Sequence, residues 1–158
     1  MLQFQKETTL LHIPFGVLEV RYPAKEFWEE ETFYAMIGEH LQTLRKQFEN
    51  YDRKTVFGEN VYFRFFKKFK KTYPVMMQFE SFLLKGRPFP RTNPITEIPF
   101  LAELETHQLL GTHDADHVQG NIQLFAGTEK TPFPGMRGEE IHTYPGDFCA
   151  RDDGGIIF

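Results

Sequence analysis

Apolar residues recur with helical spacing in the first third of the chain. Successive members of this series are separated by four, four, three and four positions, which places them along one face of a helix. They are Phe33, Ile37, Leu41, Leu44 and Phe48. The pattern predicts a helix over residues 26–48 that buries this face.

A second helix is predicted over residues 59–70, with apolar and basic side chains on different sides. Its predicted apolar side carries Val61, Phe65, Phe66 and Phe69. Its predicted basic side carries Arg64, Lys67, Lys68 and Lys71. This helix should therefore be amphipathic and basic.

Two shorter helices are expected around the proline-rich middle of the chain. The first covers residues 79–85 and ends at Gly86, since glycine accepts the left-handed conformation that often follows a helix C-terminus. The second begins at Thr96 as its N-cap, which puts Pro99 in the first turn, where a missing amide proton removes no internal hydrogen bond.

Alternation of apolar and polar residues predicts strands early and late in the chain. Residues 18–22 alternate and are expected to form a strand with one buried face, and Ile122 and Leu124 alternate with polar neighbours after Gly120. Residues 131–138 are expected to form a loop, and residues 152–155 a hairpin turn. The second half should therefore be mostly strand.

The C-terminal run Ile156–Phe158 is apolar and strand-like. Because exposed strand edges are usually shielded, three explanations are open: another part of the chain covers it, a second copy covers it in a homo-oligomer, or a C-terminal piece has been lost.

Composition narrows the class of protein. With 158 residues, of which 18 are Phe, the chain can bury one substantial aromatic core, so a single domain over residues 1–158 is expected. The formal net charge of -4 argues against a protein that coats nucleic acid nonspecifically, although local basic patches are compatible with it. No stretch approaches the roughly 18 apolar residues of a membrane span. The single Cys149 and the absence of a secretory pattern favour the cytoplasm.

The segment His113–His117 groups two imidazoles and two carboxylates. Such a group can bind a metal or support acid-base chemistry. However, Gly111 and Gly120 favour a turn, in which histidines four positions apart do not converge as they would on a helix. A turn with solvated polar groups is the default, and no metal or other cofactor is expected.

Two other groups have both a functional and a structural interpretation. The basic side of the second helix lies near Phe63 and Tyr73, and cations beside aromatic rings suit a phosphate backbone with unstacked bases, but a solvated helix face is the simpler explanation. Cys149 is a candidate nucleophile with His142 or His113, but its apolar neighbours favour a small buried residue in a sheet.

Several motifs together resemble a known family, the B3/4 domain, which is the editing module of the phenylalanyl-tRNA synthetase beta subunit and also occurs as free-standing proteins. The motifs are an aromatic and basic helix at 63–71, the helix 78–84, Lys85-Gly86, the turn Pro90-Arg91-Thr92-Asn93-Pro94, Gly111-Thr112-His113-Asp114, and the Pro-Gly-Asp and acidic hairpin segments between 144 and 154. The resemblance implies an α/β fold of the α+β type, with a helical N-terminal half packed on mixed sheets.

Membership of this family implies hydrolysis of the ester of a wrongly charged tRNA. The resemblance places the pocket near His113, Asp114 and Glu103, and makes the side chains Arg64, Lys67, Lys68 and Lys71 the candidate RNA-binding surface. The family continues past the acidic hairpin into a Gly-rich turn and a glutamate-bearing strand, whereas this sequence ends at Phe158, so a shortened domain is expected.

Two classes of function therefore stay open. One is an aminoacyl-tRNA deacylase that acts in trans on tRNA. The other is a non-catalytic module that uses the same fold to bind RNA, a small amino-acid-like ligand or a protein. A metal hydrolase at the cluster His113–His117 is a weaker third hypothesis.

Overall fold

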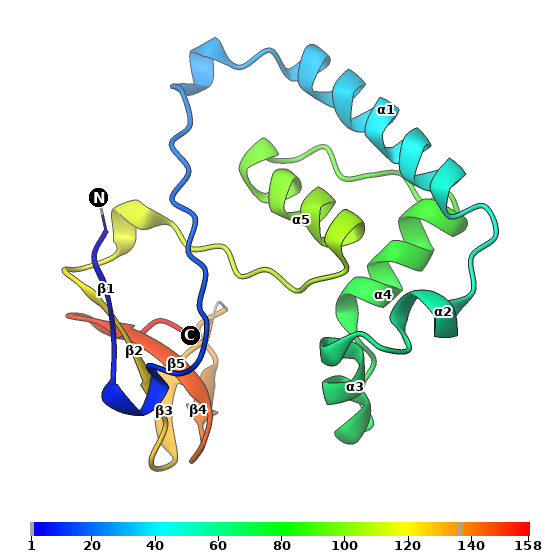
Figure 1. Ribbon diagram of the computed structural model, residues 1–158. Coiled ribbons are helices and arrows are strands. Elements are labelled where there is room, and N and C mark those ends of the chain that lie inside the picture. Colours follow the sequence, from blue (N-terminus) through cyan, green and yellow to red (C-terminus); the bar gives the residue numbers. More distant parts are fainter. Residues whose placement is uncertain (1, 136) are drawn as a thin grey trace. The chain divides into compact units, whose positions relative to one another are not determined.

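The computed structural model describes residues 2–135 and 137–158 and has an α+β fold (Figure 1). The chain forms two compact units: Tyr22–Thr112 is helical, and the residues up to Arg21 combine with His113–Phe158 into a unit of strands. Among the described residues, no helix is long and apolar enough to cross a membrane. The expected single domain over the whole chain stays a prediction.

The helical unit contains the long predicted helix and four shorter α-helices. The helices are α1 Glu30–Gln47, α2 Arg53–Phe57, α3 Val61–Lys68, α4 Pro74–Phe79 and α5 Pro94–Thr106. The 3-10 helix η2 Lys25–Phe27 precedes α1, and the π-helix η3 Glu80–Leu84 continues α4.

The predicted helix over 26–48 is confirmed in its buried face, but α1 begins at Glu30, after the separate η2. Ile37, Leu41 and Leu44 are buried, while Phe33 and Phe48 are partly buried against the same core. Acidic side chains lie in the first turn and basic ones in the last, where each favours the local end of the helix dipole.

The core of the helical unit is aromatic, as the phenylalanine content predicts. Phe57, Tyr73 and Phe79 are fully buried, and the Phe57 and Phe79 ring centroids lie 5.5 Å apart at 81°. The His107 ring lies 4.9 Å from Phe57 and 5.2 Å from Phe79, and its pKa is lowered by burial. The buried Tyr73 hydroxyl donates a hydrogen bond to the His107 backbone carbonyl at 2.9 Å, so the polar end of the Tyr73 side chain has a partner within the core.

The predicted helix over 59–70 is present as α3, and its predicted apolar side is confirmed for Phe66 but wrong for the other three residues. Phe63 and Phe66 pack against the core, while Val61, Phe65 and Phe69 are exposed. Asn60 fixes the start of the helix by accepting the Phe63 amide at 3.0 Å. Core packing by Phe63 and Phe66 therefore sets the rotation of α3 and turns the other apolar side chains outward.

The helix expected at 79–85 is longer than predicted, because α4 begins at Pro74 and η3 extends it to Leu84. Gly86 follows with φ of 66°, in agreement with its predicted left-handed conformation. Glu80 of η3 is held by Arg53, whose Nε and Nη2 donate at 2.6 and 2.7 Å, and by the Tyr51 hydroxyl at 2.7 Å. The Arg53 guanidinium holds the pKa of Glu80 below its usual value.

The helix α5 starts at a different residue from the one predicted. Asn93, rather than Thr96, is the N-cap and accepts the Ile95 amide at 3.0 Å, and Pro94 occupies the first helical position. Pro99 consequently lies inside the helix, where it offers no amide to the carbonyl four residues before it.

A buried carboxylate fixes the turn that leads into α5. Glu97 accepts the amide of Thr92, the amide of Asn93 at 3.0 Å, and the hydroxyl of Tyr34 in α1 at 2.7 Å. Burial alone would raise the pKa of Glu97, but these donated hydrogen bonds together outweigh burial and lower it. Burial and the bond to Glu97 raise the pKa of Tyr34 to about 12.

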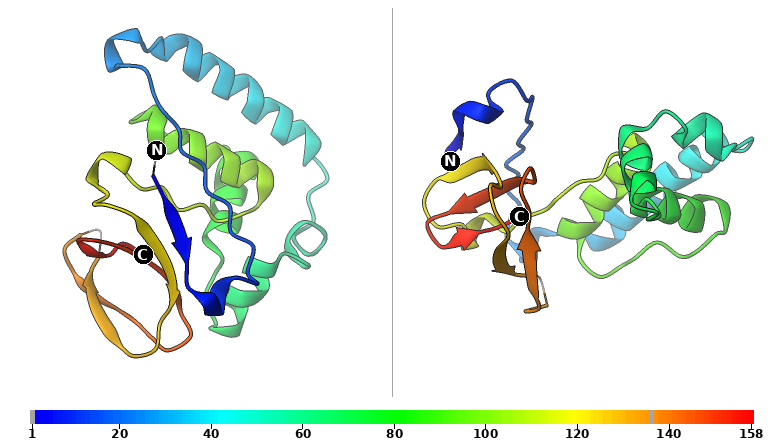
Figure 2. Two further views of the ribbon diagram at one scale, coloured as in Figure 1. Left: turned by 60° about the vertical axis from the view of Figure 1, so that its left-hand side comes forward. Right: turned by 90° about the horizontal axis from the view of Figure 1, so that it is seen from below.

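The strand unit is built on a mixed sheet of four strands in the order β1-β2-β5-β6. Its strands are β1 Phe4–Lys6, β2 Ile122–Ala126, β5 Phe148–Asp152 and β6 Gly155–Ile156. β1 runs parallel to β2 with Phe4 opposite Ile122, whereas β2 and β5 are antiparallel with Leu124 opposite Ala150 (Figure 2). A separate hairpin pairs β3 Thr131–Pro134 with β4 Glu140–Thr143.

The predictions for the strand unit are partly confirmed. β2 and the turn between β5 and β6 lie where expected, and Cys149 is buried in β5. The prediction of a strand over residues 18–22 is wrong, because this segment pairs with no described strand and Leu18 is 85% exposed. The expected loop at 131–138 contains β3.

Part of the C-terminal apolar run is covered within the chain. Ile157 donates its amide to the Ala150 carbonyl at 2.9 Å, and its side chain packs against the small core formed by Leu10, Ile122, Leu124 and Ala150. The Ala150 amide donates to Phe158 at 2.9 Å. Of the three explanations above, the structure supports intrachain cover for Ile157, and a homo-oligomer stays a hypothesis.

Replacing Glu97 by Gln should lower the free energy of unfolding by about 1–3 kcal/mol, because an NH₂ donor would replace an oxygen that accepts buried donors. The lowered pKa means that this carboxylate contributes stability above its ordinary value of 4.5, and that the contribution is lost as pH falls below 4.5. Urea unfolding of both proteins at several pH values measures this.

The matched control is Glu105→Gln, an exposed position on the same helix, which should change stability by less than about 0.5 kcal/mol. Equal stability of the Glu97→Gln variant and the wild type at neutral pH would contradict the role assigned to the Glu97 hydrogen bonds.

Candidate functional site

The predicted catalytic side chains belong to different units of the structure. Glu103 lies in α5 of the helical unit, whereas His113 and Asp114 open the C-terminal part of the strand unit. Their assembly into one site therefore stays a prediction, and each is described in its own surroundings.

Glu103 is a shielded carboxyl group with one described hydrogen-bond partner. Glu103 is 7% exposed, and its carboxylate accepts a hydrogen bond from the Leu110 amide at 2.9 Å. Burial raises the pKa of Glu103, and the Leu110 bond opposes this only in part. A carboxyl group with a raised pKa can take up and release a proton closer to neutral pH than an exposed one, which suits acid-base chemistry.

Asp114 is engaged in the turn that the sequence predicts around His113–His117. One carboxylate oxygen accepts the Asp116 amide at 3.1 Å and caps the 3-10 helix η4 Ala115–His117, while the other lies 2.9 Å from His117 Nδ1. The Asp116 amide, together with His117, lowers the pKa of Asp114. The side chain of Asp114 is thus a turn-forming group in this structure.

His113 is exposed, and its ring lies 5.2 Å from the ring of Phe158. Within residues 2–135 and 137–158, no group of three or more His, Cys, Asp or Glu side chains is arranged to hold a metal ion. The cluster His113–His117 supplies one imidazole–carboxylate pair, between Asp114 and His117.

Cys149 is in the structural position that the sequence favours. Burial raises the pKa of its thiol, and the nearby Asp147 carboxylate adds to this effect. A thiol that resists ionisation is a poor nucleophile, so the surroundings of Cys149 favour the structural interpretation.

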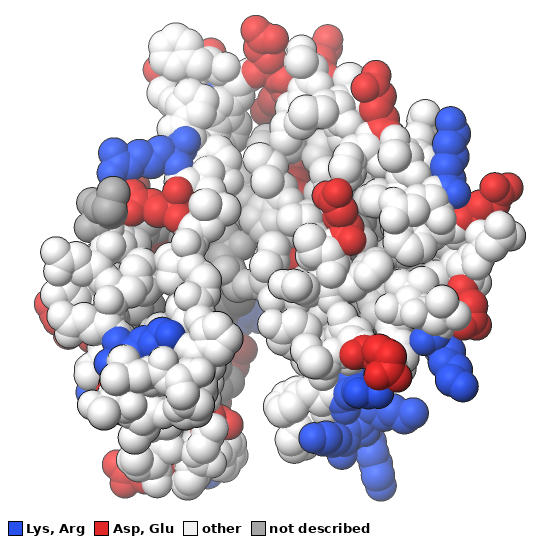
Figure 3. Space-filling model, viewed as in Figure 1, with Lys and Arg blue, Asp and Glu red and all other residues white. Residues whose placement is uncertain are grey.

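The predicted RNA-binding side chains gather at and after the C-terminal end of α3. Arg64 forms an ion pair with Glu59 and donates to the Gly58 carbonyl at 3.1 Å, whereas Lys67, Lys68 and Lys71 are exposed. Figure 3 shows basic side chains collected over the lower right of the molecule, where Figure 1 draws α3. The structure brings these cations together on α3 and on the short segment that follows it.

The aromatic neighbours proposed for this basic surface need correction. Tyr73 is fully buried and Phe63 packs against the core, so neither offers an open ring face to a ligand. The exposed rings beside the cations are those of Phe65 and Phe69, which the sequence pattern had assigned to the buried side.

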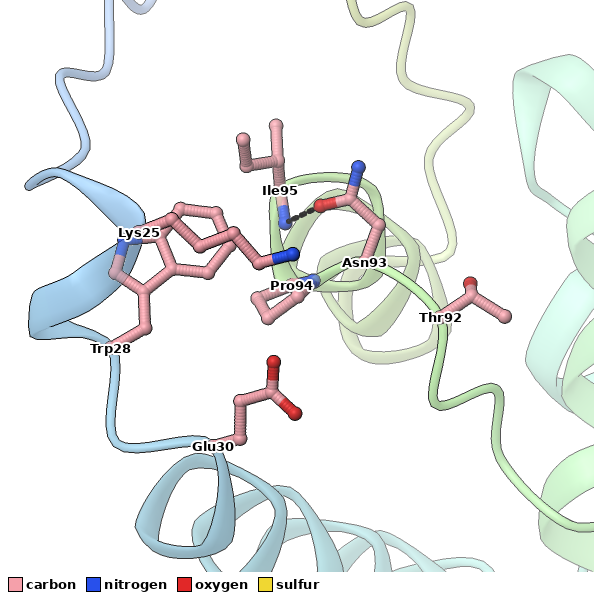
Figure 4. Close-up of a pocket in the computed structure, with 7 residues that line it drawn as sticks. All are labelled: Lys25, Trp28, Glu30, Thr92, Asn93, Pro94 and Ile95. Atoms are coloured by element: carbon pink, nitrogen blue, oxygen red, sulfur yellow. Dashed lines mark hydrogen bonds between the residues drawn. The ribbon is translucent and has the colours of Figure 1, made fainter.

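A pocket of about 220 Å³ lies at the start of α5, next to the turn that Glu97 fixes. It is lined by Lys25, Trp28, Glu30, Thr92, Asn93, Pro94 and Ile95. Figure 4 shows the charged ends of Lys25 and Glu30 turned toward the space beside Pro94. The pocket thus offers a cation, an anion and an aromatic wall to a small ligand.

Sequence patterns did not identify this pocket, because Lys25 and Glu30 approach the turn only in the folded helical unit. One local signal was available: Asn93 followed by Pro94, with Glu97 nearby, is typical of a helix start. That signal predicts the turn and its cap but gives no indication of the residues on the other side.

Comparison with known proteins assigns the family. The sequence profile described as the B3/4 domain matches residues 58–158, a segment that includes α3, α4, α5 and the strands from β2 onward. The phenylalanine–tRNA ligase beta subunit of Mycoplasma genitalium is 37% identical over 57 residues, which make up 36% of this chain and 7% of that subunit.

The matched stretch is thus a small part of that relative, and no solved structure matches the chain. The family profile, in contrast, covers well over half of the residues and contains the basic helix, the Asn-Pro turn and the acidic hairpin. The chain belongs to the B3/4 domain family and is related to the phenylalanyl-tRNA synthetase beta subunit.

Proposed function

We propose that this protein binds tRNA and hydrolyses the ester bond of wrongly charged tRNA in trans. The observation that carries the proposal is the coincidence of the family match with a compact group of cations on α3, within the matched residues. A phosphate backbone binds such a group by releasing its counterions. The cytoplasm, where the single cysteine would stay reduced, is the location that this proposal assumes.

In the proposed reaction, water attacks the ester carbonyl carbon and the bond to the ribose oxygen breaks. A general base takes a proton from the water, the ribose oxygen regains a proton, and the free amino acid leaves. The candidate base is Glu103, whose raised pKa suits proton transfer, or His113, since imidazole is a frequent general base. Asp114 has the role of holding the turn next to His113.

A non-catalytic binding module is the second candidate. Two observations favour it: Asp114 is already bonded within its own turn, and the pocket beside Pro94 offers Lys25 and Glu30 as opposite charges. A small amino-acid-like ligand carries both charges and could pair with both side chains. This function predicts that the protein binds charged tRNA or free amino acid without releasing product.

The Glu103→Gln variant should release labelled amino acid from wrongly charged tRNA at least about 100-fold more slowly than the wild type, because proton transfer contributes about 10²–10⁴-fold to such reactions. The measurement is a time course over a panel of correctly and wrongly charged tRNAs, with heat-inactivated protein as the blank. The affinity for tRNA should not change.

The Glu105→Gln variant is the matched control for charge and helix position. His113→Ala, with His12→Ala as its exposed histidine control, tests the alternative base. Circular dichroism verifies that each variant is folded. Unchanged release by both Glu103→Gln and His113→Ala would place the chemistry elsewhere, and wild-type binding without any release would support the binding module.

The pair of substitutions Lys67→Gln and Lys68→Gln should flatten the dependence of tRNA affinity on salt. Each lost phosphate contact changes the slope of log K against log salt by about 0.7–0.9, so two should change it by about 1.4–1.8. Lys46→Gln with Lys54→Gln removes the same charge from other helices and should leave the slope unchanged. Equal slopes for the two double variants would remove α3 from the RNA-binding surface.

A further inference from the structure

Exposed apolar side chains, two of them aromatic, lie in a line along α3 and its C-cap residue. Val61, Phe65 and Phe69 recur every four residues and therefore lie along one line of the helix, and they are 70%, 56% and 61% exposed. The ring centroids of Phe65 and Phe69 are 5.0 Å apart at 57°. Phe65 also contacts Phe66, which is anchored in the core, so the exposed rings rest on a packed base.

Exposed rings in such a group indicate a binding surface rather than ordinary surface variation. Single exposed apolar residues are common, but a contiguous group bordered by polar side chains is typical of an interaction site. The rotation of α3 turns Phe63 and Phe66 toward the core and leaves the rings of Phe65 and Phe69 accessible.

The charged side chains within residues 61–71, which border this surface, are all basic, and the neighbouring Glu59 pairs with Arg64. Residues 61–71 contain five cations and no acidic residue, in a protein whose formal net charge is -4. Lys68 lies three positions after Phe65 and four after Arg64, so a line of cations runs beside the line of rings. Among the described ion pairs, Arg64–Glu59 is the one that involves this group. The occupant of the surface should therefore be anionic.

The backbone after α3 adopts a left-handed conformation at Lys70, which supplies an additional cation. Lys70 has φ of 54°, in the left-handed region, at the position after a helix where glycine is usual. The amide of Lys71 closes this end by donating to the Phe66 carbonyl at 3.0 Å. The turn thereby holds two consecutive lysines directly after the exposed Phe69.

We infer that an unpaired strand of RNA binds along α3, with its bases stacked on Phe65 and Phe69 and its phosphates paired with the adjacent lysines. This inference rests on the proposed RNA-binding function and specifies the kind of RNA and the residues that read it. Aromatic side chains next to a basic track bind single strands because every base has a face that can stack.

A duplex and an acidic peptide fit this surface less well. In a duplex the base faces are buried in the stack, which would leave the exposed rings without a partner. An amphipathic peptide helix docks into a groove, and the pocket beside Pro94 is not lined by residues of α3. Two projecting rings beside lysines suit separate, flat partners, which unpaired bases provide.

The test uses the full chain with the double substitution Phe65→Ala and Phe69→Ala. Binding to a labelled, unstructured oligoadenylate, followed by fluorescence anisotropy, should weaken tenfold or more, because each stacked base contributes about 1–3 kcal/mol. The salt dependence should stay that of the wild type, since the lysines remain. Phe65→Tyr with Phe69→Tyr should restore most of the affinity, because tyrosine rings also stack.

Phe27→Ala, another exposed phenylalanine of the helical unit, is the matched control and should bind the oligonucleotide as the wild type does. Wild-type protein should prefer the single strand to a duplex of equal length. Wild-type affinity in the Phe65→Ala and Phe69→Ala variant would overturn the inference. Equal binding of the duplex, or tighter binding of an acidic peptide or of anionic lipid vesicles, would also overturn it.

The two double variants distinguish a failure of the stacking inference from a failure of the proposed RNA-binding function. If the phenylalanine variant binds normally while Lys67→Gln with Lys68→Gln still flattens the salt dependence, the stacking inference is wrong and the basic RNA-binding surface stands. If neither double variant changes binding, both are wrong.

Discussion

Packing of Phe57 and Phe79 against each other is the interaction on which the helical unit depends. These two fully buried rings also contact His107 at the end of α5, and Phe57 lies against Tyr73 just before α4. Phe63 and Phe66 join the same core and so fix the rotation of α3. The exposure of Phe65 and Phe69 is therefore a consequence of how the core is filled. The same rotation of α3 exposes the lysines between them.

Three buried glutamates show how the surroundings decide the chemistry of a side chain. Arg53 neutralises Glu80, and several donors satisfy Glu97, so both carboxylates hold the fold together with lowered pKa values. Glu103 has the Leu110 amide as its described partner, and burial raises its pKa. Of the three, Glu103 is therefore the one whose surroundings favour proton exchange, which is why it is the strongest candidate for a chemical role.

Local patterns predicted the elements that depend on a few neighbouring residues. The spacing of apolar residues predicted α1 and its buried face, and the glycines and aspartates predicted the turn between β5 and β6. Local sequence patterns gave wrong predictions where contacts between residues far apart in the sequence determine the structure. The alternation at Leu18 suggested a strand that finds no partner, and both possible apolar faces of α3 contain aromatic residues, so only the core distinguishes them. Likewise, Lys25 and Glu30 reach the Asn-Pro turn only through the fold.

The most direct test of the account is hydrogen–deuterium exchange of the wild-type protein with and without uncharged tRNA. If α3 is the RNA-binding surface, tRNA should slow amide exchange in peptides that cover residues 59–71, and peptides from α1 should exchange as before. Protection confined to other segments, or no protection at saturating tRNA, would contradict the assignment of α3 as the surface that binds RNA.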